Sequence, residues 1–256
     1  MSELNFTKLM CNKYYDYTNP DKSGILRFLT SELLAAEAAD QRVWIIGHVP
    51  SGGSSAIANP SALFHSIVAR FSPATIAGVF FGHTHKDGKQ LFYDFAQQNS
   101  SAASKGGVFR NYTDLNYNAP LNVAFVGPSI VPLTDYNAGW SVYQVDAETF
   151  SVVNGQVYFA NISNTLDWNP EPEWEFEYDV RATYDPVGQW PSTEPLNATF
   201  WNSVTEKMMS NDSLIEEYLY LATKKSVLTP SCAGACLEES ICQIRSSSGA
   251  VYETCG

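Results

Sequence analysis

Three of the four histidines in the chain directly follow apolar runs that end in glycine. His48 comes after one such run, and His83 and His85 come after the next. Neutral imidazole is a good ligand for zinc and related metals, and a glycine before it lets the backbone turn sharply beneath an ion. The pattern predicts that these three side chains bind metal. The fourth, His65, lies among apolar positions of an expected helix, so we expect a structural or surface role for it.

The pair His83 and His85 is separated by a single residue. In an extended backbone two such side chains point to the same side, about 6–7 Å apart at the backbone. Each could therefore reach a different ion of a pair spaced about 3.5–4 Å. The alternative is that the pair and His48 are ordinary loop residues that arose by chance, and their shared position after glycine-terminated runs argues against it.

The elements that must position these residues follow from hydrophobic periodicity. Apolar spacing predicts a helix over 24–39 with Ser23 as its N-cap, and a second helix opening at Asn59. Continuous apolar runs at 43–46 and 76–81 predict strands that are buried on both faces. Strands alternating with helices indicate an α/β architecture, in which ligand sites form at the carboxyl ends of strands.

The remainder of the chain divides at about residue 169. Before it, the pattern predicts one long polar loop over 97–118. It also predicts further strands at 6–11, 91–95, 121–126, 140–145 and 156–159. After it come an acidic, proline-punctuated linker over 170–195 and helical spacing over 196–225. We therefore expect two units, 1–168 and 169–256.

Charge and targeting signals restrict the partners. The formal net charge is −12, so phosphate backbones are repelled and nucleic acid is excluded as an expected partner. No apolar run reaches the roughly 20 residues that span a bilayer, and the first residues do not resemble a signal peptide.

Glycosylation sequons and cysteines nevertheless point to an oxidising compartment. Sequons begin at six asparagines: Asn5, Asn99, Asn111, Asn161, Asn197 and Asn211. Four of the five cysteines crowd the C-terminus, at Cys232, Cys236, Cys242 and Cys255. They predict either disulfides or a four-thiolate zinc site, and the sequons favour disulfides. The fifth, Cys11, is expected to be a small buried apolar residue.

Two segments around the histidines carry a specific resemblance. Residues 44–50 (Trp-Ile-Ile-Gly-His-Val-Pro) and 80–87 (Phe-Phe-Gly-His-Thr-His-Lys-Asp) resemble the last two metal motifs of calcineurin-like metallophosphoesterases. Their surroundings are similar to the acid sphingomyelinase branch, at 33–37, 67–71, 123–129 and 142–146. The resemblance implies part of the four-layer α/β sandwich of that superfamily, followed by a small helical, disulfide-stapled C-terminal subdomain.

The resemblance also implies roles for individual residues. Two zinc ions would be expected, with His48 and His83 on the second and His85 on the first. A hydroxide held between the ions would attack phosphorus in line. Asp87 would accept a hydrogen bond from an imidazole N–H, or else be an exposed turn residue. The C-terminal spacing resembles that of the family, which implies disulfides Cys232–Cys236 and Cys242–Cys255 and a free Cys11.

The sequence departs from the family where the other metal ligands should be. It contains no Gly-Asp, Asp-x-His or Gly-Asn-His motif. Three imidazoles divided between two sites cannot hold two zinc ions well. We therefore expect the chain to be the C-terminal half of a longer enzyme, inactive alone, with the missing N-terminal half as its partner.

For the intact enzyme the resemblance implies zinc-dependent hydrolysis of sphingomyelin to ceramide and phosphocholine, or of a related phosphodiester. It also implies peripheral contact with a lipid surface, without a transmembrane segment, in a secreted or in a lysosomal or vacuolar setting. Two alternatives stay open. One is a hydrolase of nucleotides or other phosphodiesters, and the other is a catalytically silent secreted glycoprotein.

Overall fold

A computed structural model describes residues 19, 21–96, 113–133, 135–164, 169 and 171–255. They form a mixed α/β structure with two sheets, as the sequence predicts and as expected for part of a metallophosphoesterase fold. In these ranges no helix combines the length and the apolar character that crossing a bilayer requires. The predicted strand at 6–11, Cys11, and the sequons at Asn5, Asn99 and Asn111 lie outside the described residues.

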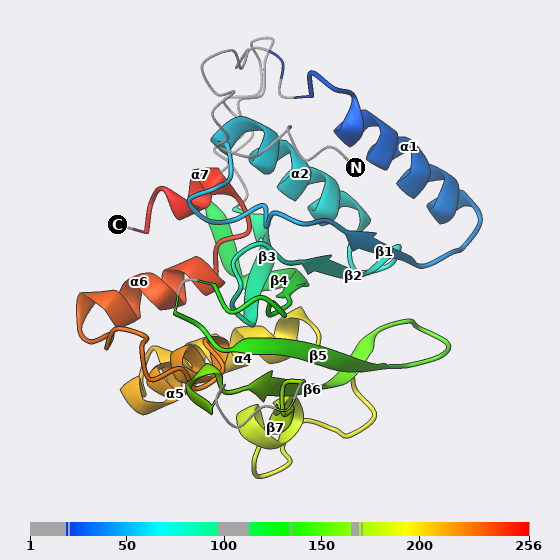
Figure 1. Cartoon of the computed structure of the whole chain (residues 1–256). Coiled ribbons are helices and arrows are strands. Elements are labelled where there is room, and N and C mark those ends of the chain that lie inside the picture. Colours follow the sequence, from blue (N-terminus) through cyan, green and yellow to red (C-terminus); the bar gives the residue numbers. More distant parts are fainter. Residues whose placement is uncertain are drawn as a thin grey trace.

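The first sheet carries the strands that end at the histidines. Its order is β1 (Val43–Ile46), β2 (Ile76–Phe81), β4 (Leu115–Val126) and β3 (Gly88–Phe95). The pairs β1–β2 and β2–β4 are parallel, and β3 runs antiparallel to β4. The helices α1 (Ile25–Ala38) and α2 (Ala58–Phe71) cover one face (Figure 1). Their apolar stripes bury side chains such as Leu33 and Val68 against this sheet.

The second sheet packs on the opposite side of the first. It contains β5 (Ala138–Val145), β6 (Val152–Ala160) and β7 (Glu175–Asp179) in antiparallel order. Rings from both sheets meet between them, since Phe80 and Phe125 both lie within 6 Å of Tyr143, at 5.7 and 5.4 Å between ring centroids. These contacts lie directly beneath the carboxyl end of β2.

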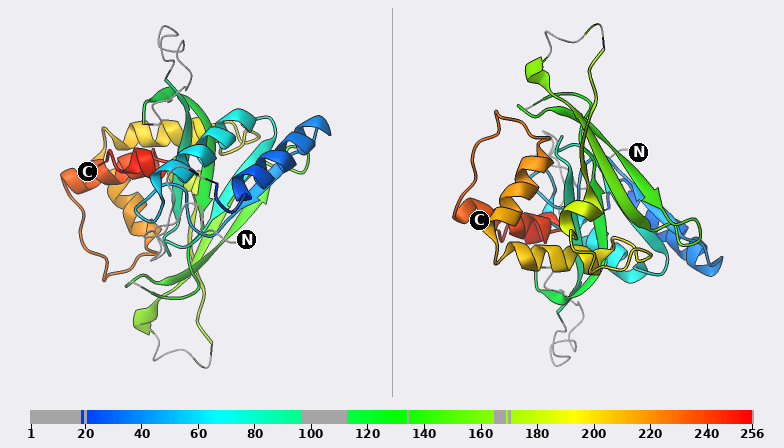
Figure 2. Two further views of the ribbon diagram at one scale, coloured as in Figure 1. Left: turned by 90° about the horizontal axis from the view of Figure 1, so that it is seen from above. Right: turned by 90° about the horizontal axis from the view of Figure 1, so that it is seen from below.

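The C-terminal helices extend the same core. The 3-10 turn η3 (Ile162–Asn164) is followed by α3 (Val180–Tyr184), α4 (Ala198–Met208), α5 (Asp212–Ala222), α6 (Ala235–Ile244) and α7 (Gly249–Tyr252). Figure 2 shows α4, α5 and α6 gathered on one side of the sheets, with α1 on the other. One cluster joins residues on both sides of position 169, including Val123, Val157 and Trp201. The predicted boundary between 1–168 and 169–256 therefore crosses a continuous core and stays a prediction.

Several element predictions need correction. The amides of the first turn of α1 are capped by Asp21, whose carboxylate accepts from Leu26 N and Arg27 N at 2.9 Å each, and the residue at the N-cap position is Gly24 rather than Ser23. The N-cap of α2 is Ile57, not Asn59. Strand β7 and helix α3 occupy part of the expected linker, and the helical stretch after 196 breaks into α4 and α5.

Strand β1 is not buried on both faces, contrary to prediction. Its residues alternate in exposure, and Trp44 and Ile46 are 41% and 69% exposed. Only one face of the strand meets the helices, because the alternate residues Val43 and Ile45 pack against the core cluster that α1 and α2 share with the sheet. Strand β2, one place further in, fits the prediction better, with four of its six residues buried.

The C-terminal cysteines form two disulfides. Cys232 bonds Cys236 and Cys242 bonds Cys255, which confirms the pairing that the family resemblance implied. The alternative four-thiolate zinc site is excluded by these bonds. The described sequon asparagines differ in exposure: Asn161 is half-buried and Asn197 and Asn211 are exposed, the last two at the starts of α4 and α5.

Candidate metal centre

His48 and His83 are brought together by the pairing of β1 with β2. Parallel strands end at the same edge of a sheet, so residues that follow neighbouring strands become neighbours. Two backbone bonds fix this junction: Gly47 N–H donates to Phe80 O at 2.9 Å and Gly82 N–H donates to His48 O at 2.8 Å. The imidazole centroids lie 5.2 Å apart with the rings at 79°. Both side chains are exposed, so an ion could approach the pair from solvent.

The segment that carries His83 and His85 is bent rather than extended. Both residues have left-handed backbone conformations, with φ of 70° and 61°. The geometric argument for an extended His-x-His therefore does not apply, although the assignment of His85 to a metal stays a prediction. Left-handed backbone is unusual for a residue with a side chain and marks a tightly constrained turn.

Each of these two histidines is held by a different neighbour. Ser55, in the loop after β1, places its Oγ 3.3 Å from His83 Nε2. The buried Lys224 donates from Nζ to the backbone oxygen of His85. His85 is half-buried, and its Nδ1 is buried with no hydrogen-bond partner in the described part of the chain. A buried imidazole nitrogen without a partner has an unmet capacity to bind a proton donor or a metal.

Asp87 fits neither predicted role. It is 3% exposed, so it is not an exposed turn residue. Its Oδ1 accepts from Lys89 Nζ at 2.8 Å and its Oδ2 accepts from the Tyr178 hydroxyl. The predicted hydrogen bond from an imidazole to Asp87 is therefore not present among the described residues. This carboxylate instead compensates a buried lysine beneath the histidine turn.

A group of buried ionisable side chains surrounds this ion pair. Burial, together with the Asp87 charge, raises the pKa of Glu177 to about 8, although Lys225 and Lys224 act in the opposite direction. Burial lowers the pKa of Lys224 to about 8. The pKa of Tyr178 is raised well above its usual range, first by burial and then by Asp87. Desolvation therefore dominates the electrostatics below the site.

His65 has the structural role that its helical position predicted. It is fully buried in α2, and its Nε2 lies 2.7 Å from Tyr93 O. A carbonyl can only accept, so Nε2 carries the proton and Nδ1 accepts from the Ser247 hydroxyl at 2.9 Å. Burial lowers the pKa of His65 to about 4, which keeps the ring neutral.

The described residues offer the kind of ligand that zinc prefers, but fewer ligands than a zinc site normally has. Imidazole nitrogen is a usual zinc ligand, and a zinc site normally has three or four protein ligands. Within the ranges that the structure describes, no three side chains of His, Cys, Asp or Glu gather closely enough to hold a metal ion. The site as described therefore offers a pair of imidazoles, and no catalytic step follows from them alone.

Ser55 and Lys224 are site residues that the sequence did not indicate. Ser55 lies seven positions after His48 in a loop with several other serines, so no spacing distinguishes it. Lys224 reaches the histidine turn from 139 positions away along the chain. A lysine after an apolar helix usually reads as a solvated C-terminal residue, and only the fold reveals that this one is buried.

Comparison with known proteins identifies relatives over most of the chain. No family model matches. Human sphingomyelin phosphodiesterase is 30% identical over 226 residues, covering 87% of this chain and 31% of its own length. Sphingomyelin phosphodiesterase 2 of Caenorhabditis elegans is 27% identical, covering 85% of this chain and 32% of its own length.

A shorter relative is covered more completely. Human acid sphingomyelinase-like phosphodiesterase 3b is 25% identical over 269 residues, covering 96% of this chain and 52% of its own length. The chain thus spans about a third of the length of the sphingomyelin phosphodiesterases it matches. Its sequence is thus similar to part of the sphingomyelin phosphodiesterases and of the acid sphingomyelinase-like phosphodiesterases.

Proposed function

We propose that this chain is the histidine-bearing part of a metal-dependent phosphodiesterase that hydrolyses sphingomyelin. The observation that carries the proposal is the meeting of His48 and His83 at the ends of β1 and β2, 5.2 Å apart between ring centroids. Two exposed imidazoles at the carboxyl ends of neighbouring parallel strands are suited to bind a zinc ion. The names of the relatives support sphingomyelin as the substrate.

We assign His48 and His83 to one zinc ion and His85 to a second. The unpartnered Nδ1 of His85 supports its assignment, because a buried imidazole nitrogen is otherwise costly to leave without a partner. The remaining ligands must come from residues outside the described ranges. The chain alone is therefore proposed to be inactive, and the rest of a longer protein completes the site.

The environment of the intact protein is part of the same proposal. Disulfides at both Cys232–Cys236 and Cys242–Cys255 support an oxidising compartment, either extracellular or lysosomal. The exposed sequons at Asn197 and Asn211 are proposed to carry glycans there. A sphingomyelin substrate also requires contact with a lipid surface.

Zinc binding to the oxidised chain tests the metal assignment. Titration calorimetry of the wild type should show weak binding, which His48→Ala and His83→Ala should each abolish. Thr84→Ala, an exposed neighbour between the two loop histidines, is the control and should bind as the wild type does. Equal affinity in the wild type and in both histidine variants would refute the site.

Activity requires the chain joined to the rest of a homologous enzyme. In that protein, His48→Ala should lower the sphingomyelin hydrolysis rate by more than about a hundredfold, since losing even an outer partner of a metal ligand costs about 10–100-fold. A comparison of sphingomyelin with a nucleotide phosphodiester distinguishes the proposed substrate from the alternative. A near-normal rate in His48→Ala would contradict the metal role.

A further inference from the structure

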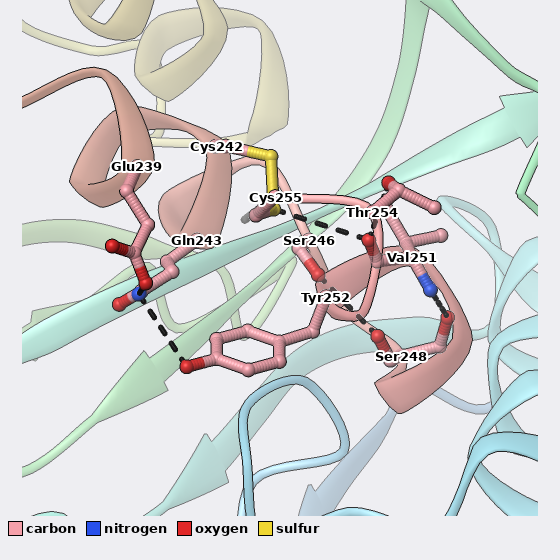
Figure 3. The surroundings of a disulfide bond; sticks show 9 residues. All are labelled: Glu239, Cys242, Gln243, Ser246, Ser248, Val251, Tyr252, Thr254 and Cys255. Carbon is pink, nitrogen blue, oxygen red and sulfur yellow. Dashed lines mark hydrogen bonds between the residues drawn. A yellow bond between two sulfur atoms is a disulfide. The ribbon is translucent and has the colours of Figure 1, made fainter. Parts of the chain in front are cut away.

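The loop that follows His48 is enclosed by the C-terminal end of the chain. Ser51 and Gly52 in this loop are buried, as are the three consecutive serines Ser246, Ser247 and Ser248, each 0% exposed. The serine triplet connects α6 to α7, and the Cys242–Cys255 disulfide closes these two helices on each other (Figure 3). Residues almost 200 positions apart thus form one buried contact.

The contact is specific at the start of the loop. Ser51 Oγ donates to Ser247 O at 2.7 Å. A Cβ added to Gly52 would lie 2.1 Å from Ser246 O, so the two backbones touch where only glycine fits. Gly52 also exchanges two hydrogen bonds with the Gln90 side-chain amide, at 3.1 and 2.8 Å. The loop is therefore fixed between β3 and the serine triplet.

The end of the loop is fixed by the same segment. A Cβ on Gly249 would lie 2.8 Å from Ala56 O, so Gly249 packs directly on this part of the loop backbone. Gly249 N–H donates to Ser61 Oγ at 2.9 Å, and that hydroxyl in turn donates to Ile57 O at 2.6 Å. Ser55, the partner of His83, lies between these two fixed points.

We propose that the segment 246–249, closed by Cys242–Cys255, is a clamp that positions Ser55 and thereby the His83 imidazole. Its members are positioning residues, since none of them is placed at the metal. The inference deepens the proposed function and rests on it only for what His83 does once oriented. Partners that orient a metal-binding imidazole are a general feature of such sites.

The second disulfide provides a matched control. Cys232–Cys236 lies at the start of the same helix, α6, and closes a short turn, with a sequence separation of 4. None of the contacts described between the loop and segment 246–249 involves either of these cysteines. The double substitution Cys232→Ser, Cys236→Ser therefore removes a disulfide and leaves the clamp closed. The double substitution Cys242→Ser, Cys255→Ser opens the chain segment that holds the serine triplet.

Hydrogen exchange of the oxidised full chain tests the clamp without any metal. The Cys242→Ser, Cys255→Ser variant should speed amide exchange in residues 51–57 by at least about tenfold, because a disulfide is typically worth about 2–4 kcal/mol. The Cys232→Ser, Cys236→Ser variant should stay within about twofold there, because its staple makes none of the loop contacts. Unchanged exchange in 51–57 after opening Cys242–Cys255 would overturn the proposal.

A single hydroxyl tests the same idea if the open variant fails to fold. Ser51→Ala removes one hydrogen bond to Ser247 and should speed exchange in 51–57 by about three- to tenfold, the worth of one net hydrogen bond. Ser31→Ala, which removes a similar bond on the exposed surface of α1, is the control. Protection in Ser51→Ala equal to that in the control would count against the clamp.

The imidazole signals of His83 separate positioning from mere stability. Nitrogen NMR shifts of His83 in Ser51→Ala should move toward those of Ser55→Ala, while Ser55→Ala should leave the protection of residues 51 and 52 intact. A loosened loop with unmoved His83 signals would reduce the clamp to a structural role and refute positioning. Zinc titration is a separate readout, and its failure in the wild type would refute the proposed function and not the clamp.

Discussion

At the scale of single residues, burial in the fold determines whether an ionisable side chain is charged. Glu177 is 6% exposed, and neither carboxylate oxygen has a hydrogen-bond partner among the described residues. The charged form of such a group is expensive, so the protein favours its neutral form. Phe176, its neighbour on β7, is 53% exposed. This neighbouring pair thus reverses the usual placement of apolar and charged residues.

Glu177 should make the protein less stable as the pH rises. Its pKa is raised from 4.5 to about 8, so its stabilising effect is complete below pH 4.5 and is lost as the pH rises through 8. His65 acts in the opposite sense, because its pKa falls from 6.5 to about 4 and stability increases over that interval. The two effects oppose each other between pH 4.5 and 6.5, and a net decline follows up to pH 8.

Glu177→Gln should remove that decline. We expect it to raise the melting temperature by several degrees at pH 8 and to change it little at pH 4.5, where the native carboxyl is already neutral. Glu175→Gln, an exposed carboxylate on the same strand, is the control. Calorimetric melting at both pH values is the measurement. A destabilised Glu177→Gln at pH 8 would mean that the buried charge has a partner.

At the scale of elements, hydrophobic periodicity predicted helices and strands correctly where it was strong. Turn-forming and capping residues predicted element ends and linkers less well. The helix at 24–39 and the strand at 76–81 emerge as α1 and β2 because their apolar spacing is unambiguous. Strand β7 was missed because the prolines around it indicated a linker. The proximity of His48 and His83 could be predicted because each residue follows a strand end, and their role at a metal stays a prediction. The Ser51–Ser247 contact, 196 positions apart, has no local signal in the sequence.

The cap of α1 gives a prediction at this scale. Asp21 accepts hydrogen bonds from the amides of Leu26 and Arg27, which have no partner within the helix. Asp21→Ala should therefore lower the free energy of unfolding by about 1 kcal/mol. Urea denaturation measures it, with Glu32→Ala in the exposed middle of the same helix as the control. Equal effects of the two substitutions would show that the cap contributes nothing.

At the scale of the whole molecule, apolar side chains remain uncovered on the strand that leads to His48. Trp44 and Ile46 on the edge strand β1 are exposed, on the face away from α1 and α2. An apolar edge strand can pair with another chain, and clustered apolar exposure favours association. The chain also spans only about a third of its sphingomyelin phosphodiesterase relatives. We propose that a further part of the longer protein covers this face and completes the sheet.

The chain alone should consequently self-associate, and the contact should involve β1. Light scattering of the oxidised, glycosylated chain should detect oligomers that Ile46→Lys reduces. Val227→Lys is the matched control, because Val227 is 79% exposed but lies in the loop after α5, and it should leave association unchanged. Supplying the remainder of the protein in cis or in trans should give a single complex and protect the β1 amides from exchange. A stable wild-type monomer that unfolds cooperatively and binds no hydrophobic dye would show instead that the chain closes its own core, and that the exposed face of β1 needs no cover.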